Sequence, residues 1–190
     1  MKYVSIDIET TGIDPELDQV IEIGAVIDDL SNPQPIDKLM TYRKYVVHTR
    51  YSGSPYALWL NSQALKNIPD RNPDYTYLPP EDIAESLFSF LSSEFPVQGN
   101  KVRLVVAGKN FGSFDRLFLT KLPKMNKLIS FRHRAIDPAM LYFDPKVDAE
   151  LPSSKLCLDR AGIGGEVAHT AVEDAKMIIK LVRKHYGIPF

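Results

Sequence analysis

The chain has 190 residues and a formal net charge of −1, and 44% of its residues are hydrophobic and 25% charged. This composition is typical of one folded domain and excludes an intrinsically disordered protein. The near-zero charge argues against a protein that binds duplex DNA mainly through a broad basic surface.

The single cysteine, Cys157, excludes an internal disulfide and a multi-cysteine zinc site. It lies in the apolar stretch "KLCL", which is typical of a small core residue. No apolar run has the length of a membrane span. Met1 and Lys2 lead directly into strand-like sequence without an apolar signal region, so we expect a cytoplasmic protein.

The first half of the chain predicts three strands followed by two helices. The strand segments are rich in β-branched and aromatic residues, and the short connections between them favour an antiparallel meander. These strands are expected at 2–9, 19–29 and 38–48. Apolar residues then recur at helical spacing in 55–68 and 81–95.

The second half alternates strands and helices. The continuous apolar run 102–108 suits a strand buried on both faces. The elements expected after it are a helix from about Ser113, a short strand at 134–137, a helix with Asp137 as N-cap before Pro138, and two helices at 153–162 and 171–187 that end at glycines. The whole order predicts an α/β fold with a mixed sheet of about five strands and helices on both faces.

Two carboxylates lie in the first predicted strand, in "SIDIETTG" at 5–12. A strand directs alternate residues to opposite faces, so Asp7 and Glu9 share one face. Neighbouring carboxylates repel each other unless they share a proton or a cation. The pair therefore indicates a metal site or a solvated edge.

A third acid, Asp115, follows the buried run in "AGKNFGSFDRLFL". It lies in the opening turn of the predicted helix, at the edge of the sheet, where sites are commonly built. The alternative is an ordinary first-turn acid, favoured by the helix dipole, with Ser113 as the N-cap.

The last group is "HTAVEDA" at 169–175. Thr170 and Glu173 have the spacing of a capping box, which places His169 before the helix and Asp174 in its first turn. Asp174 lies next to the apolar stripe of this helix and is expected to face inward or the rim of the core. A buried carboxylate is costly, and a bound cation offsets that cost.

Taken together, "SIDIETTG", "AGKNFGSFD" and "HTAVEDA" resemble the three motifs of the DEDDh, or DnaQ-like, exonucleases of the DEDD superfamily. The stretch from Ile136 to Ile163, between the second and third motifs, is similar to the family too. The resemblance implies an RNase H-like fold, one exonuclease domain over 1–190, and release of nucleoside monophosphates from the 3′ end of single-stranded DNA or RNA. The segment 51–80 matches no particular member, so the choice between DNA and RNA stays open.

The resemblance also implies roles for five residues with two divalent metal ions. Asp7 would bridge the ions, Glu9 and Asp174 would bind the ion that activates water, and Asp115 would bind the second ion. His169 would be the general base, because histidine titrates near neutral pH. Carboxylate oxygens are ligands that suit Mg²⁺ or Mn²⁺.

The family holds the terminal nucleotide just after the first motif. Gly12 would allow close approach of the backbone to the nucleotide, and Phe114 either stacks on a base or belongs to the core. The substrate-binding candidates are therefore Thr10, Thr11, Gly12, Ile13 and Phe114.

The remaining expectations concern partners and rival functions. Tyr51, Tyr56 and Trp59 are expected in the core or in a homodimer contact rather than in a stacking platform. A polymerase partner is a further alternative. Scattered basic residues, Arg132, Arg134 and Lys155, either hold phosphates or form a solvated face. The rival functions are an RNase H-like endonuclease and a catalytically silent nucleic-acid-binding module.

Overall fold

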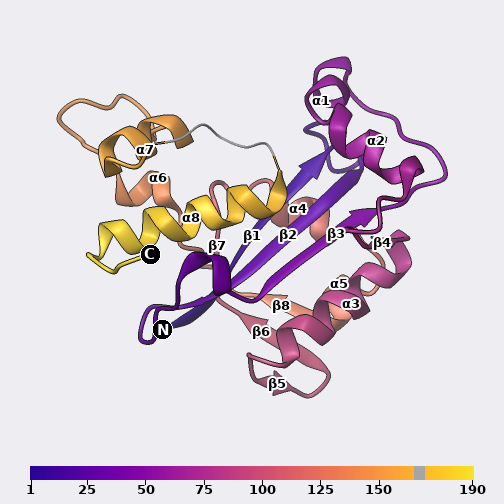
Figure 1. Ribbon diagram of the computed structural model, residues 1–190, viewed down its shortest axis with the longest axis horizontal. Coiled ribbons are helices and arrows are strands. Elements are labelled where there is room, and N and C mark those ends of the chain that lie inside the picture. The colour runs from indigo at the N-terminus through magenta and orange to yellow at the C-terminus, as the bar shows by residue number, and fades with distance from the viewer. Residues whose placement is uncertain (165–169) are drawn as a thin grey trace.

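A five-stranded mixed sheet forms the centre of the fold in the computed structural model, which describes residues 1–164 and 170–190. Its strand order is β4-β3-β2-β1-β7 (Figure 1). The first three strands are antiparallel to each other, and β4 and β7 are parallel to their neighbours. The bounds are β1 Lys2–Thr10, β2 Val20–Asp29, β3 Thr41–Val46, β4 Tyr77–Leu78 and β7 Val106–Ala107. The predicted α/β sheet and its antiparallel meander are confirmed.

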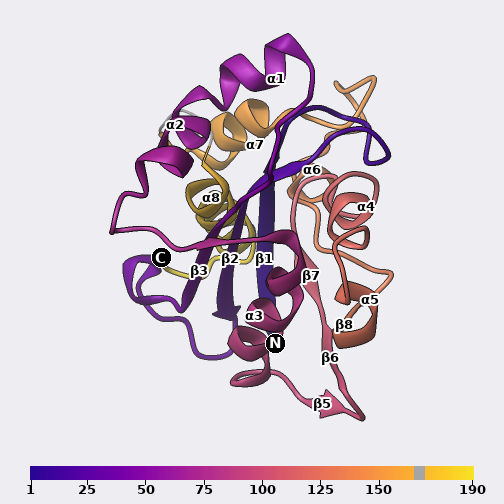
Figure 2. The ribbon, with the colours of Figure 1, turned by 90° about the vertical axis from the view of Figure 1, so that its right-hand side faces the viewer.

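Helices cover both faces of this sheet (Figures 1 and 2). One face carries α3, α4 and α5, and the other carries α6, α7 and α8. Their bounds are α3 Pro80–Ser92, α4 Asp115–Leu119, α5 Met125–Leu128, α6 Pro138–Leu141, α7 Ser154–Ala161 and α8 Ala171–His185. No helix in the described ranges is long and apolar enough to cross a membrane.

Strand β1 lies between the two helical layers and contributes side chains to the core on each side. Val4, Ile6 and Ile8 point into the larger core, which contains the apolar face of α3. Tyr3 points to the opposite face and packs with Ala175 and its apolar neighbours on α8. The alternation of the strand therefore sends the odd-numbered positions of β1, Asp7 and Glu9 included, toward α8.

The run 102–108 is divided between two sheets, so the prediction of one doubly buried strand is wrong. Its first part, β6 (Lys101–Leu104), pairs with β5 (Val97–Gln98) and β8 (Ile129–Phe131) in a second, three-stranded sheet. Only β7 joins the main sheet. The physical reason is that Lys101 and Arg103 alternate with buried Val102 and Leu104, so one face of β6 is exposed.

Several predicted element ends also differ. The Ser113 hydroxyl donates to the Asn110 carbonyl at 3.1 Å and does not cap α4, which begins at Asp115. The predicted strand at 134–137 is reduced to an isolated bridge between Ile136 and Ala107. The N-cap at Asp137 is confirmed, because its carboxylate accepts from the Ala139 N–H at 2.8 Å.

The predicted capping box at the start of α8 is wrong. Thr170 makes no side-chain cap hydrogen bond, and Glu173 pairs instead with Lys176 at 2.8 Å. The predicted helix at 55–68 is two helices, α1 (Pro55–Leu60) and α2 (Ser62–Asp70), which meet at Asn61. Figure 1 shows both lying over the end of the sheet where β1 finishes.

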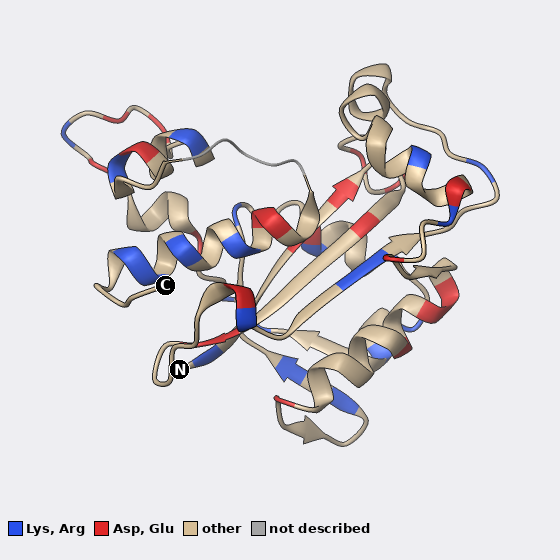
Figure 3. Ribbon diagram, in the orientation of Figure 1, with Lys and Arg blue, Asp and Glu red and all other residues tan. Residues whose placement is uncertain are grey.

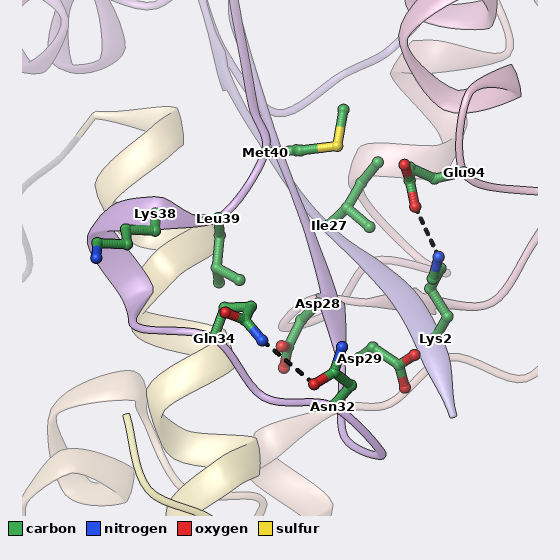
Figure 4. Close-up of a pocket in the computed structure, with 10 residues that line it drawn as sticks. All are labelled: Lys2, Ile27, Asp28, Asp29, Asn32, Gln34, Lys38, Leu39, Met40 and Glu94. Carbon is green, nitrogen blue, oxygen red and sulfur yellow. Dashed lines mark hydrogen bonds and ion pairs between the residues drawn. The ribbon is translucent and has the colours of Figure 1, made fainter.

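The two ends of the sheet carry different charge patterns. Figure 3 shows acidic residues near the end of β1, on β2 and in the first turn of α8. At the other end, a pocket of about 180 Å³ opens beside Asp28 and Gln34, with the ion pair of Lys2 and Glu94, 2.6 Å apart, at its rim (Figure 4).

A buried ion pair fixes the end of α8 to β2 near this pocket. Arg183 is fully buried, and its Nη2 lies 2.5 Å from Asp28 Oδ1. The Tyr3 hydroxyl donates to the same carboxylate at 2.8 Å, and burial raises the pKa of Tyr3. Arg183 also donates to the carbonyls of Gln34 and Pro189. All three nitrogens of the guanidinium thus donate hydrogen bonds inside the protein.

Replacing Arg183 with Met leaves the Asp28 carboxylate buried without its cation. We expect the free energy of unfolding to fall by about 3–5 kcal/mol, measured by urea denaturation. Lys184→Met, at the exposed neighbouring position, is the control and should change stability by less than about 0.5 kcal/mol. Equal stability of the two variants would contradict this account of α8.

Candidate active site

Three carboxylates meet where the end of β1 faces the start of α8. Asp7 and Glu9 come from β1, and Asp174 comes from the first turn of α8. One oxygen of each lies within 4.8 Å of the others. Asp174 is 8% exposed, so the expectation that it faces inward is confirmed. The structure therefore brings together acids that are far apart in the sequence.

The backbone of β2 determines where α8 begins. Gly24 lies opposite Asp7 in the β1–β2 register. A Cβ atom at Gly24 would lie 2.3 Å from the carbonyl carbon of Ala171, the first residue of α8. Only glycine allows the helix start to rest directly on the strand. This close approach places Asp174 over Asp7.

A fifth acid, Glu22, supports this contact and was not identified from the sequence. It lies opposite Glu9 in the register, is 1% exposed, and accepts a hydrogen bond from the backbone of Ala171. Its carboxylate is 2.7 Å from Nε of Arg43. An acid inside the apolar run "VIEIGAV" is the same signal that drew attention to Asp7.

Arg43 is itself held by aromatic residues. Its Nη2 donates to the Tyr45 hydroxyl at 3.0 Å, and its guanidinium lies over the Tyr75 ring, 4.5 Å from the ring centroid. The Tyr45 hydroxyl also accepts from Nδ2 of Asn67 in α2, at 3.1 Å. The segment 51–80 is thereby connected to the acids through Arg43.

Asp115 approaches the same site around the edge of the sheet. In the described part of the chain, β7 pairs with β1 at Val4 and Ser5 and Gly108 lies against the Ile6 carbonyl, so the ladder on that side of β1 ends before Asp7. The Asp115 carboxylate, which is 3% exposed, accepts a hydrogen bond from the backbone of Ile8 there. Asp7, Asp115 and Asp174 line one pocket of about 190 Å³.

Burial and mutual repulsion raise the pKa values of these acids. Burial raises the pKa of Asp7 well above its usual value, and Asp115, Asp174 and Glu9 add to the effect. Burial and then Asp174 raise the pKa of Glu9 to about 8, and burial raises that of Asp115 to about 7. These carboxyl groups cannot all ionise easily while they lie side by side. A divalent cation such as Mg²⁺ or Mn²⁺ suits their oxygen atoms, and its binding would displace their protons.

Asn61 is a second residue that was not identified from the sequence. It is 5% exposed and lies at the junction of α1 and α2, where its Nδ2 donates to the Thr10 carbonyl at 3.1 Å. A hydrogen bond from Asn61 also lowers the pKa of Glu9 against the larger effect of burial. No sequence signal marked this residue, because the helical pattern of 55–68 continued through it.

The residues after Glu9 form a tight loop. The Thr10 hydroxyl donates to the Gly12 carbonyl at 2.6 Å, and the Thr11 hydroxyl accepts from the backbone of Gln19 at 2.9 Å. A Cβ atom at Gly12 would lie 2.2 Å from a carboxylate oxygen of Asp18. The close neighbour of Gly12 is thus a side chain of the loop itself.

The remaining substrate-binding candidates, Ile13 and Phe114, differ in their exposure to solvent. Ile13 is 85% exposed. Phe114 lines the acid pocket and also packs on Phe118, with the ring centroids 5.1 Å apart. Both alternatives considered for Phe114 are therefore compatible with its position. His169 lies outside the described residues.

The aromatic residues of 51–59 divide between a core contact and the surface, and Tyr51 packs against the cluster that contains Ile21 and Ile68. Tyr51 is half-buried, and its hydroxyl donates to the Val46 carbonyl at 2.6 Å. Tyr56 and Trp59 lie on α1 and are 69% and 70% exposed, so the expectation of core positions is wrong for these two. Their part in a homodimer contact stays a prediction.

Comparisons with known proteins identify the fold. No family model matches the sequence, and no curated protein matches it. Solved structures do match, with 98% of this chain covered in each of the following. The nuclease domain of 3′hExo, a DEDDh family member bound to rAMP, has a TM-score of 0.66 at 16% identity, with 92% of that chain covered. E. coli Exonuclease I in complex with a dT13 oligonucleotide has a TM-score of 0.63 at 19% identity.

A third structure, the cell-death related nuclease CRN-4, has a TM-score of 0.65 at 14% identity. The chain spans 64% of the length of CRN-4 and 42% of that of Exonuclease I. At these identities the similarity establishes the architecture. The chain has the fold of the DEDDh exonucleases, which confirms the fold implied by its three motifs.

The raised pKa values predict how stability depends on pH without metal. Because the pKa values of Asp7, Glu9 and Asp115 are higher in the folded chain than in the unfolded chain, the folded chain binds more protons between about pH 5 and pH 8. The free energy of unfolding therefore falls as the pH rises. In EDTA we expect Tm to drop by several degrees across this range, and Mn²⁺ at pH 8 to restore it.

Asp7→Asn is the control for this pH dependence, because it removes the most strongly perturbed carboxyl group. Its Tm should fall less steeply with pH. A wild-type Tm in EDTA that is level or rises from pH 5 to pH 8 would contradict the burial of protonated acids.

Removing Glu22 should weaken the start of α8. In Glu22→Ala the Ala171 N–H loses its acceptor and Arg43 loses its ion pair, so we expect a loss of about 1–3 kcal/mol in the free energy of unfolding and weaker Mn²⁺ binding by calorimetry. Glu173→Ala, in the same turn of α8 but exposed, is the matched control. Equal Mn²⁺ affinity in the two variants would show that Glu22 does not position Asp174.

Proposed function

We propose that the protein is a metal-dependent 3′–5′ exonuclease that releases nucleoside monophosphates from the ends of single-stranded DNA or RNA. One observation carries the proposal: the DEDDh exonuclease fold brings Asp7, Glu9 and Asp174 within 4.8 Å, with Asp115 lining the same pocket. These are the four acids of the sequence motifs. Their donor chemistry suits two divalent cations.

The proposal keeps the ligand roles that the motif resemblance implies. Asp7 would hold both cations, and its position suits that role, because Asp115, Asp174 and Glu9 all add to the rise of its pKa. Glu9 and Asp174 would hold one cation and Asp115 the other. Bound Mg²⁺ or Mn²⁺ would supply the positive charge that stabilises the attacking and leaving oxygens of a phosphodiester hydrolysis.

The terminal nucleotide is assigned to the loop after Glu9. The hydroxyls of Thr10 and Thr11 are engaged within the loop, so contacts there would come from the backbone and from the exposed side chain of Ile13. Phe114 lines the acid pocket and is positioned to stack on a base. Aromatic stacking accepts any base, which suits an enzyme that removes nucleotides one after another.

His169 is assigned as the general base from its place in the third motif, five residues before Asp174. Histidine is the side chain whose unperturbed pKa lies closest to neutral pH, which favours proton transfer from water there. Asn61 is assigned to orient Glu9, because its amide contacts both the Thr10 carbonyl and the Glu9 carboxylate.

The structural neighbours support the end of a nucleic-acid strand as the substrate, but they do not favour DNA over RNA. Exonuclease I was solved with a DNA oligonucleotide and the 3′hExo domain with a ribonucleotide. Discrimination of the 2′ position rests on few contacts. The proposal therefore includes both DNA and RNA.

The test is a time course on 5′-labelled single-stranded DNA and RNA with Mg²⁺ or Mn²⁺. We expect a ladder that shortens from the 3′ end and disappears with EDTA. Asp7→Asn should lower the rate by about a thousandfold or more while the circular dichroism spectrum stays unchanged. Asp159→Asn, an exposed acid on α7, is the matched control and should keep its activity.

Other outcomes would contradict the proposal in distinct ways. Internal cuts would indicate an RNase H-like endonuclease. Binding of either strand without cleavage in any metal would indicate a silent binding module. Full activity of Asp7→Asn would remove the acids from the chemistry.

A further inference from the structure

A third pocket lies between α4, α5, β6 and β8, and its lining is basic. Its volume is about 270 Å³. The charged and ionisable groups that line it are Lys101, Arg116 and His133, and its polar groups are Thr120, Asn126 and Ser130. No acidic side chain of the described residues lines it.

The cations of this pocket have no acidic partner at ion-pair distance among the residues that the structure describes. Within residues 1–164 and 170–190, neither Lys101 nor Arg116 forms an ion pair. The neighbouring cations behave differently, because Lys121 pairs with Glu16 and Lys124 pairs with Glu85. What marks the pocket is therefore two cations in one lining that contains no described carboxylate.

The exposed face of β6 extends the basic surface. Lys101 and Arg103 lie on the same face of the strand because they are two residues apart, and Arg103 is opposite Ser130 of β8 in the register. Arg132 and Arg134, also exposed, follow β8 directly and form no ion pair in the described part of the chain. The division of 102–108 into two strands creates this face.

The start of α4 separates this pocket from the acids. Asp115 and Arg116 are its first two residues, and consecutive residues on a helix point about 100° apart. Asp115 lines the acid pocket and Arg116 lines the basic one. A strand whose 3′ end lies at the acids can therefore continue past α4 to reach the cations.

We propose that this basic pocket binds the phosphate backbone of the substrate strand upstream of its 3′ end. The inference rests on the proposed function. Phosphodiesters supply the repeated negative charge that unpaired lysine and arginine side chains attract, and hydroxyl and amide groups hydrogen-bond phosphate oxygens. The large apolar residues in its lining, Ile129 and Phe131, are buried, so it holds the backbone and not the bases.

A pocket of this kind makes binding depend on strand length and on salt. Under this proposal a trinucleotide contacts only the acid pocket, whereas a dodecanucleotide also contacts the lysine and arginine side chains of the basic pocket. The test measures the affinity of both oligonucleotides in the Asp7→Asn background, where cleavage is blocked. The key variant combines Lys101→Ala, Arg103→Ala and Arg116→Ala.

We expect this triple variant to bind the dodecanucleotide at least about tenfold more weakly and the trinucleotide with unchanged affinity. The slope of log affinity against log salt concentration should decrease by about 2 for the dodecanucleotide, since each lost contact to a single strand contributes about 0.7. Lys38→Ala, Lys146→Ala and Lys184→Ala together remove the same charge from exposed positions outside the pocket and form the matched control.

The single variant Lys101→Glu leaves α4 unchanged, because Lys101 lies on β6. It should also weaken dodecanucleotide binding. Equal dodecanucleotide affinity in the triple variant and the control would overturn the inference. Cleavage of the trinucleotide by the wild-type protein tests the acid site separately. If the trinucleotide is cleaved and the pocket variants still bind the dodecanucleotide normally, this inference fails while the proposed function stands.

Discussion

The contact between the start of α8 and the backbone of β2 is the constraint on which the site depends. Gly24 lets Ala171 lie against the strand, and Glu22 accepts the N–H of the same residue. Because Asp7 is opposite Gly24 in the register, this contact places the first turn of α8 over the acids of β1. A side chain at Gly24 would move Asp174 away from Asp7, and the carboxylate cluster would not form.

Bringing four carboxylates together opposes folding, and the rest of the molecule offsets that cost. Burial and repulsion raise the pKa values of Asp7, Glu9 and Asp115. The apolar faces of α3 and α8 bury both sides of the central strands. The unfavourable electrostatics at one end of the sheet are the property that a divalent cation would relieve, so stability and proposed function are coupled there.

Much of the fold was predictable from local patterns. The alternation in β1 gave the shared face of Asp7 and Glu9, and Asp137 before Pro138 correctly marked the start of α6. Patterns failed where another partner or another sheet was available. Glu173 pairs with Lys176, one turn further along α8, and does not form a capping box. The run 102–108 is split because Lys101 and Arg103 face solvent on β6, which belongs to a second sheet.

The sequence by itself determined which acids share a site, because the alternation of a strand and the first turn of a helix are local properties. It identified Asp7, Glu9, Asp115 and Asp174 and the α/β class of the fold. Only the tertiary structure decided that Glu22, Arg43 and Asn61 support these acids, since each acts through partners many residues away. Local periodicity contains no information about such contacts, which arise only when the strands pair and α8 packs on the sheet.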